Sequence, residues 1–260
     1  NASGNQRKNM VQSVENSLRR LQTDYIDLFY LHVWDSRTPV EEILRSFDDL
    51  VRAGKILYVG ISDTPAWQVS RMQAIAELRG WSPLVALQIS YSLAERTVER
   101  ELIPMAREMG LGVLPWSPLA GGILSGKYAA SDLNANSQSG QRELGTRKDI
   151  NLATGRLSER TLAIANSVRE VADAMGRTPA QVALAWTLLN PAVASTIMGV
   201  RTIAQLEDNL AALDIAFTDE HIAMLDAISR VELGFPHDLL DSPSSRMMFG
   251  GVNVEKPQRR

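Results

Sequence analysis

Five groups of polar residues stand at or just beyond the ends of apolar runs in this sequence, where side chains are well placed to bind a ligand. They are His32, Ser62 with Asp63, Gln88, Trp116 with Ser117, and Gly199 to Arg201. Taken singly they have ordinary structural explanations, such as a core amide for Gln88, a packing residue for Trp116 and a helix cap for Ser62. Because the C-terminal ends of parallel strands meet at one rim, the groups together predict a binding site there.

The last group, within GVRTIAQLEDN, has the character of an anion site. Gly199 and Arg201 come just before a predicted helix, whose free N–H groups and dipole favour negative charge. The Arg201 guanidinium can make a bidentate contact with a phosphate. Three polar residues share one face of the first turns of that helix, namely Gln205, Asp208 and Asn209. A simple capping box from Thr202 to Gln205 is the plainer alternative.

Other partial motif matches lack the flanking residues that the motif requires. The stretch GGILSGKY, 121–128, matches the start of a P-loop, but Tyr128 occupies the Ser/Thr position and the flanking residues are loop-like. The Rossmann glycine pattern is absent, and His32, His221 and His237 are scattered without the spacing of metal ligands. We therefore predict neither a nucleoside triphosphate site nor a metal site.

The elements that must position the polar groups alternate between helix and strand. Apolar runs predict strands at 25–32, 56–62, 84–90 and 110–116, which begin about 30 residues apart, as in βα units. Helical spacing predicts helices at 7–21, 38–54, 65–78 and 99–109. The second of these has unusually clear start signals, with Thr38 as N-cap, Pro39 in the first turn and Glu41 completing a capping box.

The rhythm changes after Trp116. Residues 117–157 are rich in glycine, serine and asparagine and predict a long loop. Helices follow at 159–175, at about 178–189 after a capping box at Thr178, from Thr202 onward and at 219–228. A fifth strand is predicted at 194–200, and an irregular tail at 234–260.

Five strands are too few to close an eight-stranded barrel, and the first element is a helix with no strand before it. We therefore predict an α/β fold of the (β/α)8 barrel type in a single domain, 1–260, with about five of eight βα units present. The alternative is an open, doubly wound five-stranded sheet. It is disfavoured because no glycine-rich turn marks a switch point.

Composition limits the partners. Hydrophobic residues make up 45% of the chain, which is ample for a core. The net charge of −3 and the pI near 5.7 argue against a nucleic-acid or anionic-membrane partner. There are no cysteines, no apolar run reaches the roughly 18 residues of a spanning helix, and the N-terminus lacks a signal-peptide pattern. A cytoplasmic protein with no membrane partner is expected.

With these residues in view, the chain resembles the aldo-keto reductases from about residue 7 to residue 250. The stretches that carry the resemblance are SLRRLQTDYIDLFYLH, GKILYVGIS, LQISYSL, GLGVLPWSPLAGGILSGKY and STIMGVRTIAQLEDNL. The resemblance implies a (β/α)8 barrel that binds NADP(H) without a Rossmann fingerprint. It also implies reduction of small-molecule aldehydes and ketones, or the reverse reaction.

Position by position, the resemblance implies roles for the polar groups. His32 matches the active-site histidine, which orients and polarises the substrate carbonyl. Trp34, the loop 117–157 and the tail, with RMMFGG at 246–251, would border the cofactor and substrate pocket. The implied cofactor contacts are the nicotinamide group Ser62, Asp63, Gln88 and Trp116, the pyrophosphate loop Ser117, Leu119 and Gly121, and the 2′-phosphate and adenine segment Gly199, Arg201, Gln205, Asp208 and Asn209.

The chain departs from the family pattern in two ways. Asp63 stands where asparagine is usual, and an ionised carboxylate cannot donate a hydrogen bond to the carboxamide oxygen. The catalytic tyrosine, lysine and aspartate of the family belong to the first three βα units, before this sequence begins. We therefore expect a reductase lacking its N-terminal third, with weak or no turnover by this chain alone.

Three functions stay open at this point. The leading one is NADPH-dependent carbonyl reduction. The second is a regulatory protein that binds the cofactor without turnover, similar to the potassium-channel β-subunits. The third is a non-functional remnant with exposed sheet edges. A homo-oligomer or a complementing N-terminal segment would be the expected protein partner.

Overall fold

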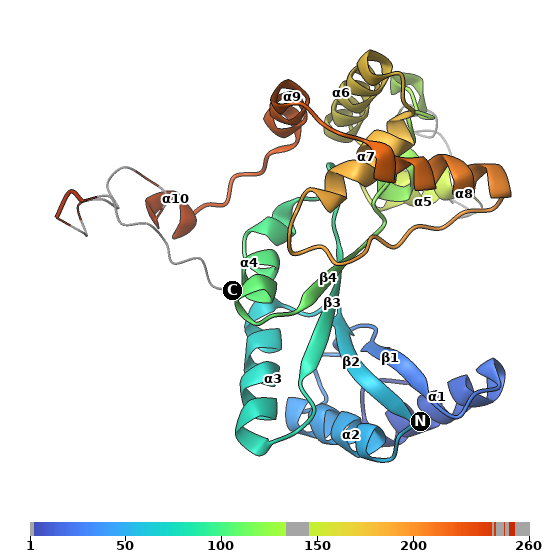
Figure 1. The fold of residues 1–260 in the computed structure, drawn as a ribbon, viewed down its shortest axis with the longest axis vertical. Helices are drawn as coiled ribbons and strands as arrows, with labels where there is room; N and C mark the ends of the chain where they lie inside the picture. Colours follow the sequence, from blue (N-terminus) through green and yellow to red (C-terminus); the bar gives the residue numbers. More distant parts are fainter. Residues whose placement is uncertain (1–2, 134–145, 241, 243–246, 248–249, 253–260) are drawn as a thin grey trace.

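The computed structural model describes residues 3–133, 146–240, 242, 247 and 250–252. Its first half is a parallel sheet of four strands that lie side by side in chain order (Figure 1). The strands are β1 (Ile26–Leu31), β2 (Ile56–Ser62), β3 (Leu84–Ser90) and β4 (Gly112–Trp116). Their helices are α1 (Arg7–Leu21), α2 (Val40–Arg52), α3 (Ala66–Arg79) and α4 (Leu102–Glu108), with a 3₁₀ turn, η1 (Thr97–Glu99), before α4.

The helices cover one side of this sheet. Each of α1 to α4 packs against the next in the series, and Phe29 of β1 meets Phe47 of α2 with 6.5 Å between ring centroids. Strands in chain order with successive helices on one side form the wall of a barrel, whereas a doubly wound sheet reverses its strand order. The prediction of a partial (β/α)8 fold is therefore confirmed over its doubly wound alternative.

The opposite face of the sheet carries alternate residues of each strand beyond the register shift at Val59/Gly60. Tyr30, Gly60, Ala86 and Gly112 form one row in the strand register. A Cβ built on Gly60 would lie 2.8 Å from Cζ of Tyr30 and closer to other ring atoms, so the tyrosine ring occupies the space over Gly60. Because side chains alternate along a strand, Ser62, Gln88 and Trp116 lie on this same face, nearer the C-terminal ends.

The predicted fifth strand does not form as a regular strand, which corrects the sequence analysis. Residues 192–197 run beside β4 and form one parallel bridge, between Val113 and Val193. In this bridge the Val113 N–H donates to the Ala192 carbonyl, and the Val113 carbonyl accepts from the Ala194 N–H. The next pair of hydrogen bonds in a regular ladder would involve Pro115, which has no N–H to donate. The Pro115 carbonyl accepts from the N–H of Ile197, one residue beyond the one that a regular ladder would use. Proline in the neighbouring strand therefore interrupts this ladder.

The second half of the chain is helical, and all of its helices except the last gather beyond the ends of β3 and β4 (Figure 1). It holds α5 (Arg147–Ala153), α6 (Glu159–Met175), α7 (Pro179–Leu188), α8 (Ile203–Leu210), α9 (Asp219–Ser229) and α10 (His237–Leu240), with 3₁₀ turns η2 (Ala120–Ser125), η3 (Ala130–Asp132) and η4 (Ala211–Asp214). The predicted long loop 117–157 thus contains η2, η3 and α5, and its residues 134–145 lie outside the described part. In place of the strand–loop–helix of a P-loop, residues 121–125 belong to η2.

The predicted helix caps fare differently. Thr178 caps α7 as expected, accepting from the N–H of Gln181 at 3.2 Å. Thr202 caps α8 in the same way. The capping box at Thr38 was wrong: its hydroxyl donates to Asp35 at 2.7 Å, and α2 begins at Val40 without a side-chain cap. The Thr38 N–H also donates to Asp35, at 2.9 Å, so the carboxylate holds this residue in the loop that precedes the helix.

Candidate functional site at the rim of the sheet

The C-terminal ends of β2, β3 and β4 bring three of the predicted residues to one face of the sheet. Ser62 pairs in register with Gln88 on the next strand, and Ser90 pairs with Trp116. The indole N–H of Trp116 donates to Asp63 Oδ1 at 3.2 Å, although β3 lies between their strands. The indole therefore reaches back across the strand ends and is tethered at its polar edge.

Ser62 offers an unused polar group at this rim. This residue is 1% exposed, and among the described residues its hydroxyl has no hydrogen-bond partner. The Tyr30 hydroxyl, on the same face of the sheet, is also buried and unpartnered. Because buried polar atoms normally have partners, an unpartnered hydroxyl at the same rim as a tethered aromatic ring fits a site for a polar, planar ligand.

His32 directly follows β1 and is exposed. The loop after it is held by reciprocal bonds: Asn5 N–H donates to Asp35 Oδ2 at 2.8 Å, and Asp35 N–H donates to Asn5 Oδ1 at 2.7 Å. Within this loop Trp34 meets Trp67 of α3 edge-on, with 5.7 Å between centroids. Trp67 is 62% exposed, so the pair presents an aromatic wall near His32.

The loop that carries His32 and Trp34 should respond to acid through Asp35. Burial alone would raise the pKa of this carboxyl, but hydrogen bonds from the N–H groups of Thr38, Asn5 and Arg37 and from the Thr38 hydroxyl hold it well below its usual range. A depressed pKa adds stability that is complete above the unfolded pKa of about 3.9 and is lost as pH falls through the folded value.

We therefore expect wild-type protein to exceed Asp35→Asn in free energy of unfolding by a constant amount at neutral pH. The difference should shrink as pH falls below about 4, where the unfolded carboxyl starts to bind protons. Urea unfolding of both proteins across this range measures it. A difference that stays level down to pH 2 would contradict the role of Asp35.

The loop after β4 makes a backbone cradle. Ser117, Gly121 and Gly122 all have positive φ, at 55°, 67° and 88°. The Ser117 hydroxyl accepts from Gly121 N–H at 3.3 Å, and the Leu119 carbonyl accepts from Gly122 N–H at 2.8 Å. A Cβ on Gly121 would lie 3.0 Å from Nδ2 of the buried Asn151 and closer to Oδ1, so only glycine fits there.

Two cations beside this cradle were missed by the sequence analysis. Lys127 folds back so that its Nζ lies 2.6 Å from where a Cβ of Gly122 would be. The Arg156 guanidinium lies over the Trp116 ring, 5.6 Å from its centroid. Positive groups beside a glycine-rich turn suit a bound phosphate. Lys127 directly follows the glycine-containing turn, so the sequence could have indicated it as a phosphate ligand. Arg156 is distant in sequence from Trp116, and no local pattern indicated it.

The segment 199–209 lies apart from the strand ends. Gly199 and Arg201 are exposed, and the Arg201 N–H donates to the Gln205 side chain at 2.9 Å. Asp208 turns the other way and accepts from Gln181 of α7 at 2.8 Å and from the Thr178 hydroxyl. Asn209 is buried. Arg201 and Gln205 thus form one exposed group, while Asp208 also holds α8 to α7.

The described part of the tail attaches beside the rim, at the turn after β3. Arg100 Nη2 donates to the Phe235 carbonyl at 3.1 Å, and His237 contacts Glu101 at 3.2 Å. Of the stretch 246–251, only Met247, Gly250 and Gly251 belong to the described residues, and Met247 is exposed. The placement of residues 243–246, 248–249 and 253–260 lies outside the described part.

Over the described ranges, His, Asp and Glu side chains form no group of three or more that could hold a metal ion. Within the same ranges, none of the helices combines the length and apolar character needed to cross a bilayer.

Comparisons with known proteins agree on one family. The model of the aldo/keto reductase family matches residues 1–230. An uncharacterized oxidoreductase, YrpG, of Bacillus subtilis is 41% identical over 83% of this chain and 62% of its own length. A probable aryl-alcohol dehydrogenase, AAD4, of Saccharomyces cerevisiae is 34% identical over 94% of the chain and 72% of its own length.

A norsolorinic acid reductase, stcV, of Emericella nidulans is 34% identical over 95% of this chain and 60% of its own length. The chain thus spans less than two thirds of two of these three relatives. The match to the family model covers both the strand ends and the segment around Arg201. This chain belongs to the aldo/keto reductase family.

Proposed function

We propose that this chain binds NADP(H) along the rim of its sheet and serves in an NADP-dependent oxidoreductase that interconverts a carbonyl and an alcohol. The observation that carries the proposal is the Trp116 ring, tethered to Asp63 next to the buried, unpartnered Ser62 hydroxyl. A flat aromatic ring and a free hydroxyl suit a planar ring that bears a carboxamide. The glycine cradle and Lys127 suit its pyrophosphate, and Arg201 suits a 2′-phosphate.

The nicotinamide supplies a hydride when it is bound. The residues of this chain would then orient the reactants: Trp116 would pack against the ring, Ser62 would hold the carboxamide, and the N–H of His32 would polarise the substrate carbonyl. Burial raises the pKa of the Tyr30 phenol, and it raises that of Tyr91, whose hydroxyl donates to Glu99 at 2.9 Å. The Tyr91 phenol is engaged with Glu99 and the Tyr30 phenol is buried, so we expect weak turnover from this chain alone.

The substrate class that we propose is an aromatic carbonyl or alcohol. The Trp34–Trp67 pair stands near His32 and can stack on an aryl ring. The names of two relatives, an aryl-alcohol dehydrogenase and a norsolorinic acid reductase, are in line with this class.

We also propose that the open edge of β1 pairs with further strands, either of a complementing segment or of a second copy. β1 is at one end of the described sheet, and Tyr25, Leu57 and Tyr58 near that edge are exposed. An unpaired edge flanked by apolar side chains favours association. Binding of NADPH without turnover, even in the presence of such a complementing segment, would instead favour the regulatory role.

The proposal is tested by titrating the purified chain with NADPH and with NADH while following tryptophan fluorescence. We expect saturable quenching that prefers NADPH and that is largely lost in Trp116→Phe. Arg201→Met should weaken NADPH binding by about tenfold, because a charge-assisted phosphate contact is worth about 1.5 kcal/mol or more, and should leave NADH binding unchanged.

Arg71→Met is the matched control, because Arg71 pairs with Glu41 on the surface of α2 and α3, away from the rim. Its affinity for both cofactors should equal that of the wild-type chain. A folded wild-type chain that shows no saturable binding of either cofactor would overturn the proposed function.

A further inference from the structure

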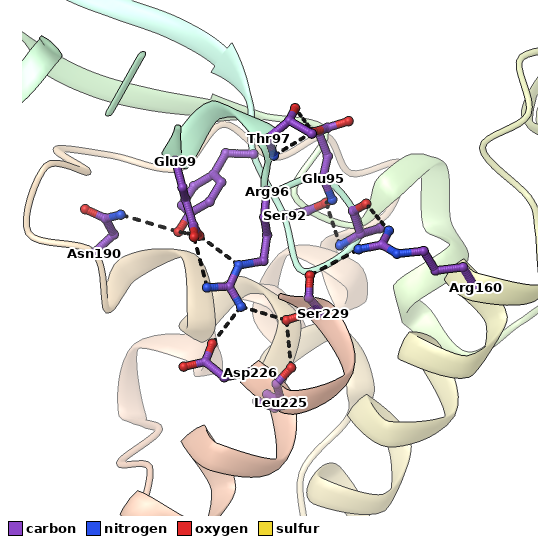
Figure 2. A network of polar contacts seen from close by, with 12 residues as sticks. Ser92, Glu95, Arg96, Thr97, Glu99, Arg160, Asn190, Leu225, Asp226 and Ser229 are labelled. Carbon is purple, nitrogen blue, oxygen red and sulfur yellow. Dashed lines mark hydrogen bonds and ion pairs between the residues drawn. The ribbon is translucent and has the colours of Figure 1, made fainter. Parts of the chain in front are cut away.

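A buried arginine joins the two halves of the molecule (Figure 2). Arg96, in the turn after β3, donates from Nε and Nη2 to both carboxylate oxygens of Glu99, at 2.8 and 3.0 Å. Its Nη1 donates to Asp226 at 2.7 Å and to the Ser229 hydroxyl at 2.8 Å, both in α9. We call these residues, together with Tyr91 and Asn190, the Arg96 joint.

The joint is enclosed and reinforced. The Arg96 side chain is 10% exposed, and its guanidinium lies over the Trp186 ring of α7, 5.0 Å from the centroid. Arg160 of α6 adds two bonds to backbone carbonyls, of Ala94 at 3.2 Å and Ser229 at 3.1 Å. Three helices of the second half, α6, α7 and α9, are thereby fixed to a single turn of the sheet half.

The joint continues to β4 through a chain of hydrogen bonds. The Tyr91 hydroxyl donates to Glu99, and Asn190 Nδ2 donates to the Tyr91 oxygen at 3.4 Å. Asn190 Oδ1 accepts from Ala192 N–H at 3.1 Å, and the Ala192 carbonyl accepts from Val113 of β4 at 2.9 Å. Residue 192 begins the segment that leads to Gly199 and Arg201.

The two candidate ligand groups belong to the two parts of the molecule that this joint connects. Ser62 and Trp116 belong to the sheet half, whereas Arg201 and Gln205 belong to the helical half. A dinucleotide that contacts both groups binds as two linked fragments. Its affinity therefore depends on whether the two half-sites stay at the separation that the ligand spans.

We propose that Arg96 is a positioning residue for dinucleotide binding: it holds the phosphate-binding half at a fixed separation from the nicotinamide-binding half without touching the ligand. This inference rests on the proposed function. The planar guanidinium fork suits the task, because it bonds Glu99 and α9 at once, which a lysine ammonium cannot do with the same geometry.

The test compares a bridging ligand with its two fragments. NADPH spans both half-sites, adenosine 2′,5′-bisphosphate reaches only the Arg201 group, and reduced nicotinamide mononucleotide reaches only the strand ends. In Arg96→Lys we expect NADPH binding to weaken by about tenfold, which is part of the roughly 10²- to 10⁴-fold gain that linkage of two sites can give. Both fragments should bind as they do to the wild-type chain, by calorimetry and tryptophan quenching.

Two further variants keep the test decisive if Arg96→Lys folds poorly. Asp226→Ala removes one arm of the joint from a half-exposed position and should weaken NADPH selectively, whereas Asp226→Asn keeps an acceptor and should restore binding. Arg71→Lys is the control for the lysine substitution. Unchanged NADPH affinity in folded Arg96→Lys and Asp226→Ala overturns the inference, as does equal weakening of all three ligands. Failure of the wild-type chain to bind NADPH overturns the proposed function and this inference with it.

Discussion

Replacing Arg96 by methionine is expected to lower the free energy of unfolding by about 3–5 kcal/mol, the usual result of breaking a buried ion pair from one side. The substitution leaves the carboxylates of Glu99 and Asp226 without their cation and the Ser229 hydroxyl without this donor. It also removes the contact of the guanidinium with the Trp186 ring. Urea unfolding followed by tryptophan fluorescence measures the loss.

A surface pair provides the control for this prediction. Arg71→Met breaks the ion pair with Glu41, whose two side chains are about half exposed, and should change the free energy of unfolding by at most about 1 kcal/mol. Adding Glu99→Gln to Arg96→Met should recover part of the loss, because one stranded charge disappears. A loss below about 1 kcal/mol in Arg96→Met would show that water reaches the joint and screens it.

Gly60→Ala should destabilise the sheet by about 2–3 kcal/mol, in the upper part of the range for overpacking. The added Cβ would overlap the ring of Tyr30, which lies over Gly60 on the next strand. Tyr30 precedes His32 by two residues, and Gly60 precedes Ser62 by two residues. Displacement of the Tyr30 ring would therefore disturb the sheet directly below the rim. Thermal and urea unfolding report the loss.

Two comparisons isolate the contact between Gly60 and Tyr30. Gly199→Ala places its Cβ where nothing lies within 4 Å and should leave stability within about 0.5 kcal/mol. The double variant Gly60→Ala with Tyr30→Leu should be more stable than the sum of the single losses predicts, because the smaller side chain makes room. Strict additivity of the two losses would mean that the ring does not constrain Gly60.

Much of the fold was accessible from sequence because it depends on local pattern. The bounds predicted for β2, β3 and α6 match the structure residue for residue. Each is an apolar run or a stripe of apolar residues at helical spacing. The parallel arrangement then places Ser62, Gln88 and Trp116 at one edge, since only the order of the elements is needed for that conclusion.

Other features were decided by contacts between distant residues. Thr38 had every local mark of a helix cap, yet Asp35 took its hydroxyl once the loop was folded against Asn5. The fifth strand had a suitable composition, but its ladder depends on a neighbour that contains Pro115. In each case the local preference, for a helix cap or for a strand, was overridden by a residue that the sequence alone does not identify as a partner.

The sequence by itself determined the family, the order of strands and helices, and the rim at which the polar residues gather, because hydrophobic periodicity and strand direction set these. Only the tertiary structure decided that Asp63 tethers Trp116, that Arg156 lies over the same ring, and that Arg96 reaches α9. These contacts join residues 53, 40 and 130 positions apart in the chain. Their partners are selected by how the helices pack on the sheet, which no local pattern encodes.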